Sequence, residues 1–378
     1  MIPFLDLKQQ QAVLGPEIAV AVAQVFDRGQ YILGPEVAAF EQEFARYLGV
    51  THAIGVASGT DALHLALRAC GIGPGHEVIT VPNTAVATIA AIELSGATPV
   101  LVDVEPHGLN IAPGLVEAAI TSRTRAILPV HLYGRAAELA PLLDIAQRRG
   151  LRVIEDACQA HGASYHGRRV GGWGDIGCFS FYPTKNLGGA GDGGMVTTND
   201  PALAERLRLL RTYGWAERDR SVLKGMNSRL DELQAAILRV KLRYLDDWTA
   251  RRCALASRYT EALCGLASVR PPEAAVDGGH VYHLYVVRSG QRDRLREFLA
   301  QREIGSLVHY PHPIHLQEPY RELGRGPGSF PEAERAANEV LSLPLHPWLT
   351  DDQAGAVIAA LREFDSAAAV SVGSLGGS

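Results

Sequence analysis

The chain has 378 residues, of which 47% are hydrophobic and 20% charged, and its formal net charge at pH 7 is −5. This profile is typical of a soluble globular protein of two domains, without the basic charge of a nucleic-acid binder or an apolar run of membrane-spanning length. The five cysteines are odd in number and form no Cys-x-x-Cys pair, and no signal-peptide pattern precedes them, so free thiols in a reducing cytoplasm are expected.

Strand-like and helix-like segments alternate over the first 211 residues. The predicted strands are 53–57, 77–81, 98–104, 126–132, 151–155, 175–182 and 195–198. The predicted helices are 15–28, 36–48, 61–69, 86–95, 140–149 and 202–211. This repeated β-α-β spacing predicts an α/β fold with a mostly parallel sheet and helices on both faces.

A long helical stretch, 230–263, follows and can bridge two domains. Beyond it, the pattern predicts a strand at 281–288 and helices at 292–302, 331–340 and 351–364. The sequence therefore predicts a large domain at 1–250, a smaller C-terminal α/β domain at 251–366 and a disordered tail rich in glycine and serine at 367–378.

Lys185 follows a short aromatic strand and precedes a glycine-rich turn. Pro183 ends the strand because proline cannot donate to the ladder, and five glycines lie between residues 188 and 194. A lysine placed in this way can be a partly desolvated amine with a lowered pKa that forms a Schiff base, or a surface lysine on a loop. This segment alone leaves both interpretations open.

Ser58-Gly59-Thr60 lies between a predicted strand and a predicted helix. The free N–H groups and positive dipole end of that helix form a ready anion site, although an ordinary N-cap explains the same residues. Neither the P-loop pattern nor the Rossmann glycine pattern occurs, which disfavours ATP and dinucleotides as ligands.

Asp156 and Asp103 each follow the apolar part of a predicted strand, at the edge where open α/β sheets place their ligands. A carboxylate there can hold a proton on a heterocyclic nitrogen, as the pyridinium of pyridoxal phosphate (PLP) requires. Topology does not choose between the two residues.

The spacing of the histidines bears on whether the chain has a metal site. His309, His312 and His315 recur at intervals of three, but Pro311 and Pro313 exclude a regular helix, so no shared face and no metal site is predicted. His131, at the end of a predicted strand, either lines a pocket or is a core residue with satisfied nitrogens.

Four motifs occur together in the order of one known family. They are Ser58-Gly59-Thr60, Glu155-Asp156-Ala157 with Gln159, Ser180 to Lys185 with Gly191 to Gly194, and Asn227-Ser228-Arg229 with Gln234. Each motif is weak alone, but the ordered set closely resembles the DegT/StrS family of PLP-dependent nucleotide-sugar aminotransferases. This family belongs to the aspartate aminotransferase superfamily, and the resemblance runs from Ile2 to Pro347.

The resemblance implies the PLP-dependent transferase fold of type I and a homodimer with shared active sites. Lys185 would form the Schiff base and move protons, while Asp156 would pair with the pyridine nitrogen, which decides the tie with Asp103. Gln159 would contact the ring or its phenolic oxygen. The residues implied to bind the phosphate are Gly59, Thr60, Ser180 and, from the partner subunit, Asn227.

One position departs from the family pattern. Many relatives carry an aromatic residue that stacks on the cofactor where this chain has Ala85, so either another side chain fills the space or the cofactor is held less tightly. Some relatives replace the lysine with histidine and become dehydratases, and Lys185 argues against that branch.

The implied reaction moves an amino group from glutamate to a keto group of a nucleotide-linked deoxyhexose. The loop that carries Asp192 looks like the branch that aminates C3 of dTDP-linked 3-keto-6-deoxyhexoses, although Asp-Gly is also a common turn pair. The alternatives are C4 amination, a UDP- or GDP-linked keto-sugar, or a cyclitol ketone as acceptor. A free amino acid is a further alternative, for which Arg229 is the candidate partner of the substrate carboxylate. A non-catalytic regulatory protein is disfavoured by the intact Lys185 and Asp156.

Overall fold

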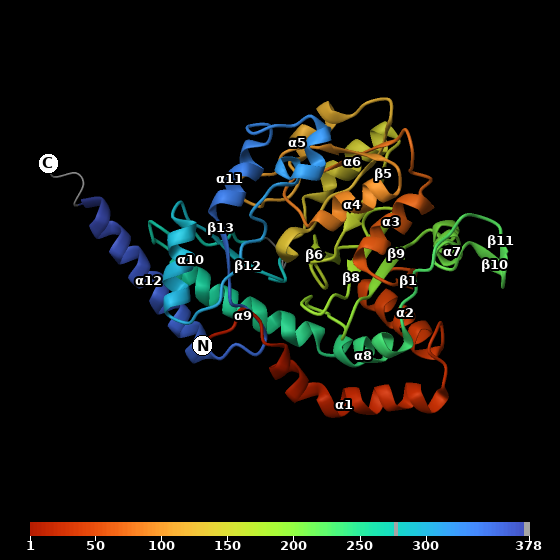
Figure 1. Cartoon of the computed structure of the whole chain (residues 1–378), viewed down its shortest axis with the longest axis horizontal. Coiled ribbons are helices and arrows are strands. Elements are labelled where there is room, and N and C mark those ends of the chain that lie inside the picture. Colours follow the sequence, from red (N-terminus) through yellow and green to blue (C-terminus); the bar gives the residue numbers. More distant parts are fainter. Residues whose placement is uncertain (276–278, 374–378) are drawn as a thin grey trace.

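The computed structural model describes residues 1–275 and 279–373, and its largest sheet has seven strands (Figure 1). Their order is β1 (His52–Val56), β9 (Gly194–Thr198), β8 (Ile176–Ser180), β5 (Arg152–Asp156), β4 (Thr124–Ile127), β2 (Glu77–Thr80) and β3 (Thr98–Leu101). β9 is antiparallel to both neighbours, and the other adjacent pairs are parallel. The predicted α/β fold with a mostly parallel sheet is confirmed.

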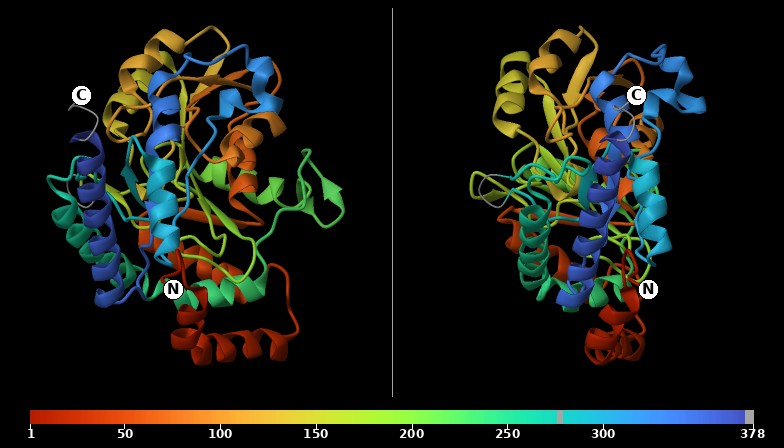
Figure 2. Two further views of the ribbon diagram at one scale, coloured as in Figure 1. Left: turned by 60° about the vertical axis from the view of Figure 1, so that its left-hand side comes forward. Right: turned by 90° about the vertical axis from the view of Figure 1, so that its left-hand side faces the viewer.

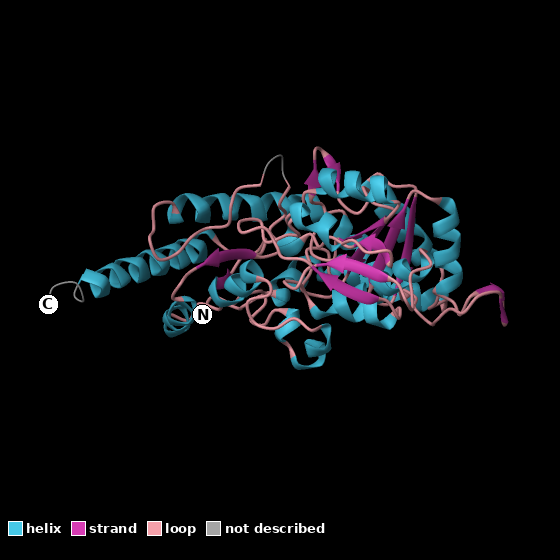
Figure 3. Ribbon diagram, turned by 90° about the horizontal axis from the view of Figure 1, so that it is seen from above, coloured by secondary structure: helices cyan, strands magenta, loops and turns pink. Residues whose placement is uncertain are grey.

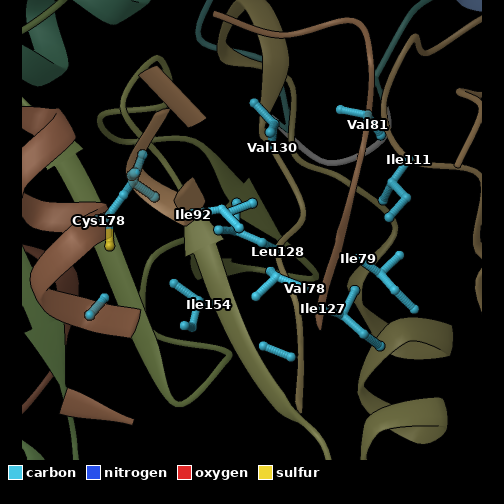
Figure 4. Close-up of a cluster of buried hydrophobic side chains, with 14 of the residues drawn as sticks. Val78, Ile79, Val81, Ile92, Ile111, Ile127, Leu128, Val130, Ile154 and Cys178 are labelled. Carbon is cyan, nitrogen blue, oxygen red and sulfur yellow. The ribbon is translucent and has the colours of Figure 1, made fainter. Parts of the chain in front are cut away.

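Alternation of side chains along the strands divides the core of this sheet into two apolar clusters. On β8, Cys178 belongs to one cluster and Phe179 to the other, and Val196 and Met195 on β9 divide in the same way. Figure 4 shows part of the first cluster, around Ile154 and Cys178. Figure 3 shows helices on both sides of the strands, as the β-α-β spacing predicts.

Different helices cover the two faces. The cluster of Cys178 includes residues of α3 (Gly59–Ala69), α4 (Val86–Leu94), α6 (Leu139–Arg149), α7 (Pro201–Leu210) and α11 (Pro331–Glu339). The cluster of Phe179 includes residues of α2 (Pro35–Leu48) and α8 (Glu232–Leu242). The remaining short elements are α5 (Pro113–Val116), the hairpins β6 (Ser164–Tyr165) with β7 (Arg168–Arg169) and β10 (Trp215–Glu217) with β11 (Arg220–Ser221), and 3-10 turns at Glu117–Ala119, Leu132–Gly134, Ile314–Leu316 and Glu318–Leu323.

A third apolar cluster belongs to the C-terminal part of the chain. It joins the antiparallel pair β12 (Tyr285–Arg288) and β13 (Val340–Leu343) to α9 (Leu245–Leu263), α10 (Arg292–Gln301) and α12 (Asp351–Gly373). Helix α9 contributes Leu245 to the cluster of Phe179 and Leu255 to this one, so it bridges the two parts. The domain boundary near residue 250 would fall within this helix and stays a prediction.

Helix α1 (Leu7–Arg28) begins earlier than the sequence predicts. The Asp6 side chain caps it by accepting from the Gln9 N–H at 3.0 Å, and the helix continues through Pro16. Its inner face packs on α8 through Leu14 and Ile18, while the helix stands off from the rest of the chain (Figure 2).

The helical stretch predicted at 230–263 consists of two helices, because the chain breaks between α8 and α9. The break has no glycine or proline; instead, Arg243 and Tyr244 both bond to Glu17 of α1, at 2.7 and 2.6 Å. Helix α12 extends to Gly373, into the segment predicted as a disordered tail, and residues 374–378 lie outside the described residues. Of the helices described, none is long and apolar enough to cross a membrane.

Candidate active site

The carboxyl ends of β5 and β8 and the start of α3 meet at a cavity of about 230 Å³. The strand register places Val56, Gly194 and Ser180 side by side, which brings the turn after β1 next to the end of β8. Six of the seven predicted site residues line this cavity, namely Gly59, Thr60, Asp156, Gln159, Ser180 and Lys185. The seventh, Asn227, does not.

The loop that carries Lys185 folds back on the end of β8. The Lys185 N–H donates to the Tyr182 carbonyl at 2.9 Å, and a Cβ on Gly188 would lie 2.4 Å from the Pro183 carbonyl oxygen, so glycine is required there. Burial lowers the pKa of the Lys185 amine, although Cys158 and Asp156 oppose the shift. A lowered pKa increases the fraction of neutral amine at neutral pH, and the neutral amine is the form that acts as nucleophile and base.

Two side chains of α8 hold this loop. Lys241 Nζ donates to the Gly188 carbonyl at 2.6 Å and to Gln10 Oε1 at 3.0 Å, and Gln234 Oε1 accepts from the Ala190 N–H at 2.7 Å. Lys241 is only 5% exposed, and burial lowers its pKa to about 8. Gln234 belongs to a recognised motif, whereas no sequence signal pointed to Lys241.

Asp156 is almost fully buried at the end of β5. Its Oδ2 accepts from the Thr88 hydroxyl at 2.8 Å and its Oδ1 from the Cys158 N–H at 3.2 Å. The Thr88 hydroxyl lies 2.8 Å from that of Thr84, and because Thr88 already donates to Asp156, it must accept from Thr84. A directed chain of hydroxyls therefore ends on this carboxylate.

Asp103 has a different role. Its two carboxylate oxygens accept from the N–H groups of Glu332 and Ala333, at 2.9 and 3.0 Å, in the first turn of α11. Asp103 therefore caps a helix. It does not line the cavity, which agrees with the choice of Asp156 that the family resemblance implies.

The Ser58-Gly59-Thr60 turn both caps helix α3 and leaves free amides that could bind an anion. Ser58 Oγ is the cap, accepting from the Asp61 N–H at 3.1 Å, and the amides of Gly59 and Thr60 are left without intrahelical partners. A Cβ on Gly59 would lie 2.6 Å from Ser180 Cβ, so glycine lets β8 approach the helix start. Free amides at a helix start, with hydroxyls beside them, fit a phosphate group.

Gln159 is fixed at both ends of its amide. Its Oε1 accepts from the Tyr133 N–H at 2.8 Å and its Nε2 donates to Tyr310 Oη at 3.0 Å. Burial raises the pKa of Tyr310 to about 12, so its hydroxyl is protonated at neutral pH. Tyr310 lies within the span of the family resemblance, but no local signal linked either tyrosine to Gln159.

Ala85 lines the cavity together with Ala87, so small side chains border it where many relatives have an aromatic residue. Tyr182, which also lines the cavity, is 53% exposed. The effect on cofactor binding stays a prediction.

Asn227 is exposed on the outside of its own chain. The next residue, Ser228, is buried; its hydroxyl donates to Asp61 at 2.7 Å and accepts from the Ala57 N–H at 3.1 Å. Asn227 therefore follows the chain to a place near the start of α3 but does not line the cavity. This position is compatible with a role in a partner subunit, which stays a prediction.

The histidines considered in the sequence do not converge on one point. His131 is fully buried; its Nδ1 accepts from the Ala137 N–H at 3.0 Å and its Nε2 lies 3.1 Å from Glu155, so it is a satisfied core residue. His309 and His315 bond separately to Ser342 and Glu334. Within residues 1–275 and 279–373, no cluster of three metal-ligating side chains occurs.

Comparison with known proteins agrees with this site. The model of the DegT/DnrJ/EryC1/StrS aminotransferase family matches residues 13–362. The chain is 52% identical over 363 residues to a dTDP-3-amino-3,4,6-trideoxy-alpha-D-glucose transaminase of Streptomyces venezuelae, covering 96% of each protein. It is also 50% identical to the erythromycin biosynthesis sensory transduction protein EryC1 of Saccharopolyspora erythraea, covering 96% of this chain and 99% of that protein.

The structural comparison is equally extensive. The crystal structure of S. venezuelae DesV in complex with a ketimine intermediate superposes with a TM-score of 0.95 at 52% identity, covering 96% of this chain and 98% of that one. The cavity, with its half-buried lysine, strand-end carboxylate and phosphate-type donors, fits the cofactor of such enzymes, pyridoxal phosphate. The chain is thus a PLP-dependent aminotransferase that belongs to the DegT/DnrJ/EryC1/StrS aminotransferase family.

Proposed function

We propose that this aminotransferase moves an amino group from glutamate to the 3-keto group of a dTDP-linked 3-keto-6-deoxyhexose. The observation that carries the proposal is the convergence of Lys185 and Asp156 on one cavity beside a phosphate-type helix start. The choice of a dTDP-linked sugar and of C3 is supported by the name of the S. venezuelae relative and by the loop that carries Asp192.

Five of the residues that line the cavity have a role in this proposal. When bound, PLP supplies an electron sink that labilises the bond to the α-hydrogen of the amino donor. Asp156 would keep a proton on the ring nitrogen, and Gly59, Thr60 and Ser180 would hold the phosphate. The Lys185 amine would take the α-proton from glutamate in the first half-reaction and deliver a proton to C3 of the sugar in the second.

We further propose a homodimer in which Asn227 binds the phosphate held by the partner subunit. The outer face of α1 supports a second copy as its cover, because Val13 and Val20, seven residues apart on the same side of the helix, are 60% and 61% exposed. Exposed apolar residues gathered on one face of a helix are typical of a protein interface. The five free cysteines support a reducing, cytoplasmic location.

The test combines covalent trapping with the first half-reaction. Borohydride reduction of the PLP-loaded enzyme should label the peptide of Lys185, and Lys185→Ala should lose the label. Incubation with glutamate should release 2-oxoglutarate. A nucleotide keto-sugar added afterwards should change in mass by the amount expected when an amino group replaces the keto oxygen. A label on Lys241, a buried lysine that bonds to the same loop, would refute the assignment of Lys185. Failure to bind PLP would instead favour the regulatory alternative, and PLP binding without formation of 2-oxoglutarate would refute glutamate as the donor.

A further inference from the structure

A second cavity, of about 350 Å³, adjoins the loop that carries Lys185. Its walls are mostly leucines, and its polar lining residues are Thr184, Arg252, His283 and His309. Thr184 is the residue before Lys185, so this cavity neighbours the reacting amine. None of the predicted cofactor residues lines it.

Arg252 of α9 is a buried cation without a carboxylate partner. It is 4% exposed, and its Nη1 donates only to the carbonyls of Tyr282 and Leu345, at 3.1 and 2.8 Å. Its Nε has no hydrogen-bond partner, and among the described residues the guanidinium bonds to these carbonyls and to no carboxylate. Burial lowers the pKa of Arg252 to about 10, which leaves it charged at neutral pH. A buried unpaired charge is costly, so this guanidinium is suited to bind an anion.

The two histidines add polarity but no charge. Burial lowers the pKa of His309 to about 4, and it lowers the pKa of His283 well below its usual range. The charges of Lys185 and Arg252 lower the pKa of His283 further. His283 and Arg252 line the same cavity. His283 Nδ1 has no hydrogen-bond partner. Among the described residues that line this cavity, Arg252 is therefore the one with a charged side chain.

The lining favours a carboxylate on a short aliphatic chain. A single guanidinium among leucines suits one carboxylate with apolar methylenes, whereas a diphosphate needs several donors. Glutamate has this form, with two methylenes between its side-chain carboxylate and the carbon that bears the amino group. Because Thr184 lines this cavity and Lys185 is the next residue, a donor whose carboxylate meets the guanidinium would lie beside the loop that carries the reacting lysine.

We propose that Arg252 binds the side-chain carboxylate of the amino donor in this cavity. The proposal rests on the proposed use of glutamate as donor. It assigns the two cavities to different parts of the reaction, one to the cofactor and one to the donor's carboxylate.

The first test leaves Arg252 in place. Leu307 lines the cavity and is 48% exposed, so Leu307→Glu adds a carboxylate near the guanidinium at a position that tolerates polarity, and Leu307→Gln is its uncharged control. Calorimetry on the PLP-loaded enzyme should show that Leu307→Glu weakens glutarate binding by about tenfold relative to Leu307→Gln, because the new carboxylate competes for Arg252. Binding of dTDP should be equal in the two variants.

The second test changes the guanidinium. Arg252→Met should raise the KM for glutamate by about thirtyfold or more, with Arg252→Lys between it and the wild type. The rate at which the pyridoxamine form aminates the keto-sugar should stay unchanged, which a general loss of structure would not allow.

The outcomes separate this inference from the function on which it rests. A wild-type enzyme that forms no 2-oxoglutarate from glutamate would refute the proposed donor. If it does form 2-oxoglutarate, equal glutarate affinity in the Leu307 pair would overturn the role of Arg252. No measurable glutarate binding by the wild type, or a selective loss of dTDP binding in Leu307→Glu, would overturn it as well.

Discussion

The Thr88 hydroxyl donates to Asp156 Oδ2 across 2.8 Å, and this bond joins α4 to the carboxylate at the end of β5. Thr84 supports Thr88 in turn, so the carboxylate is oriented by two buried hydroxyls. Strand β5 thus carries the carboxylate, and a threonine of helix α4 orients it.

Removal of the Thr88 hydroxyl should change the orientation of the Asp156 carboxylate without creating a cavity in the core. Thr88→Val keeps the side-chain shape, and we expect turnover to fall by about tenfold or more, since a hydrogen bond to a charged group contributes about 1.5–3 kcal/mol. Thr88→Ser restores the donor and should restore most of the activity and the wild-type absorbance spectrum of the bound cofactor. Equal activity and spectra in Thr88→Val and wild type would show that the bond does not orient Asp156.

Substitution of Asp156 should reduce turnover, whereas substitution of Asp103 should reduce stability. Asp156→Asn should fold normally but lower turnover by a factor on the order of one hundred or more, because the ring nitrogen loses its anionic partner. Asp103→Ala should retain cofactor binding but lower the free energy of unfolding by about 1–2 kcal/mol, because α11 loses its cap. Urea unfolding and steady-state rates distinguish the two, and a reversal of these effects would contradict the assignment.

Lys241 should give the protein a measurable pH dependence of stability. Its pKa is lowered to about 8 by burial from an ordinary value of 10.5, so between these values the unfolded chain holds a proton that the folded chain has released. Stability contributed at this site therefore rises as the pH increases through that window. Comparison of wild type with Lys241→Met by urea unfolding at pH 7 and pH 10 should show a relative gain for the wild type at pH 10; an equal difference at both pH values would contradict this.

Asn227 can be tested by subunit mixing. If it serves the partner's phosphate, Lys185→Ala and an inactive Asn227→Ala variant should regain activity on mixing, because one site of each heterodimer has both native residues. Labelled subunits and native mass spectrometry confirm exchange. Activity that stays absent after exchange would place Asn227 in its own subunit's site or outside any site.

Much of the site was predictable because its residues lie in contiguous motifs at strand ends. Lys185 is marked by an aromatic strand before it and glycines after it, and the Ser58 turn by its position before a helix. Asp156 and Asp103 were equivalent by topology, and only the three-dimensional contacts show that Asp103 caps α11.

The features that were missed depend on contacts between distant segments. Thr88 lies 68 residues from Asp156, and Lys241 lies 53 residues from Gly188, so neither partner leaves a local pattern. The break between α8 and α9 arises where two side chains bind Glu17 of α1 rather than from a helix-breaking residue. The sequence pattern predicts a helix up to residue 340 and does not predict strand β13, because the pairing of β13 with β12 is a long-range contact.

The position of the new nitrogen tests the proposed function most directly. The enzyme is supplied with glutamate and, separately, with the 3-keto and 4-keto isomers of a dTDP-linked 6-deoxyhexose, and NMR locates the nitrogen in each product. The loop beside Lys185 should hold C3 within reach, because a misplacement of about 1 Å can cost about a hundredfold in rate. Amination at C3 of the 3-keto isomer is the expected result, and exclusive amination of the 4-keto isomer at C4 would contradict it.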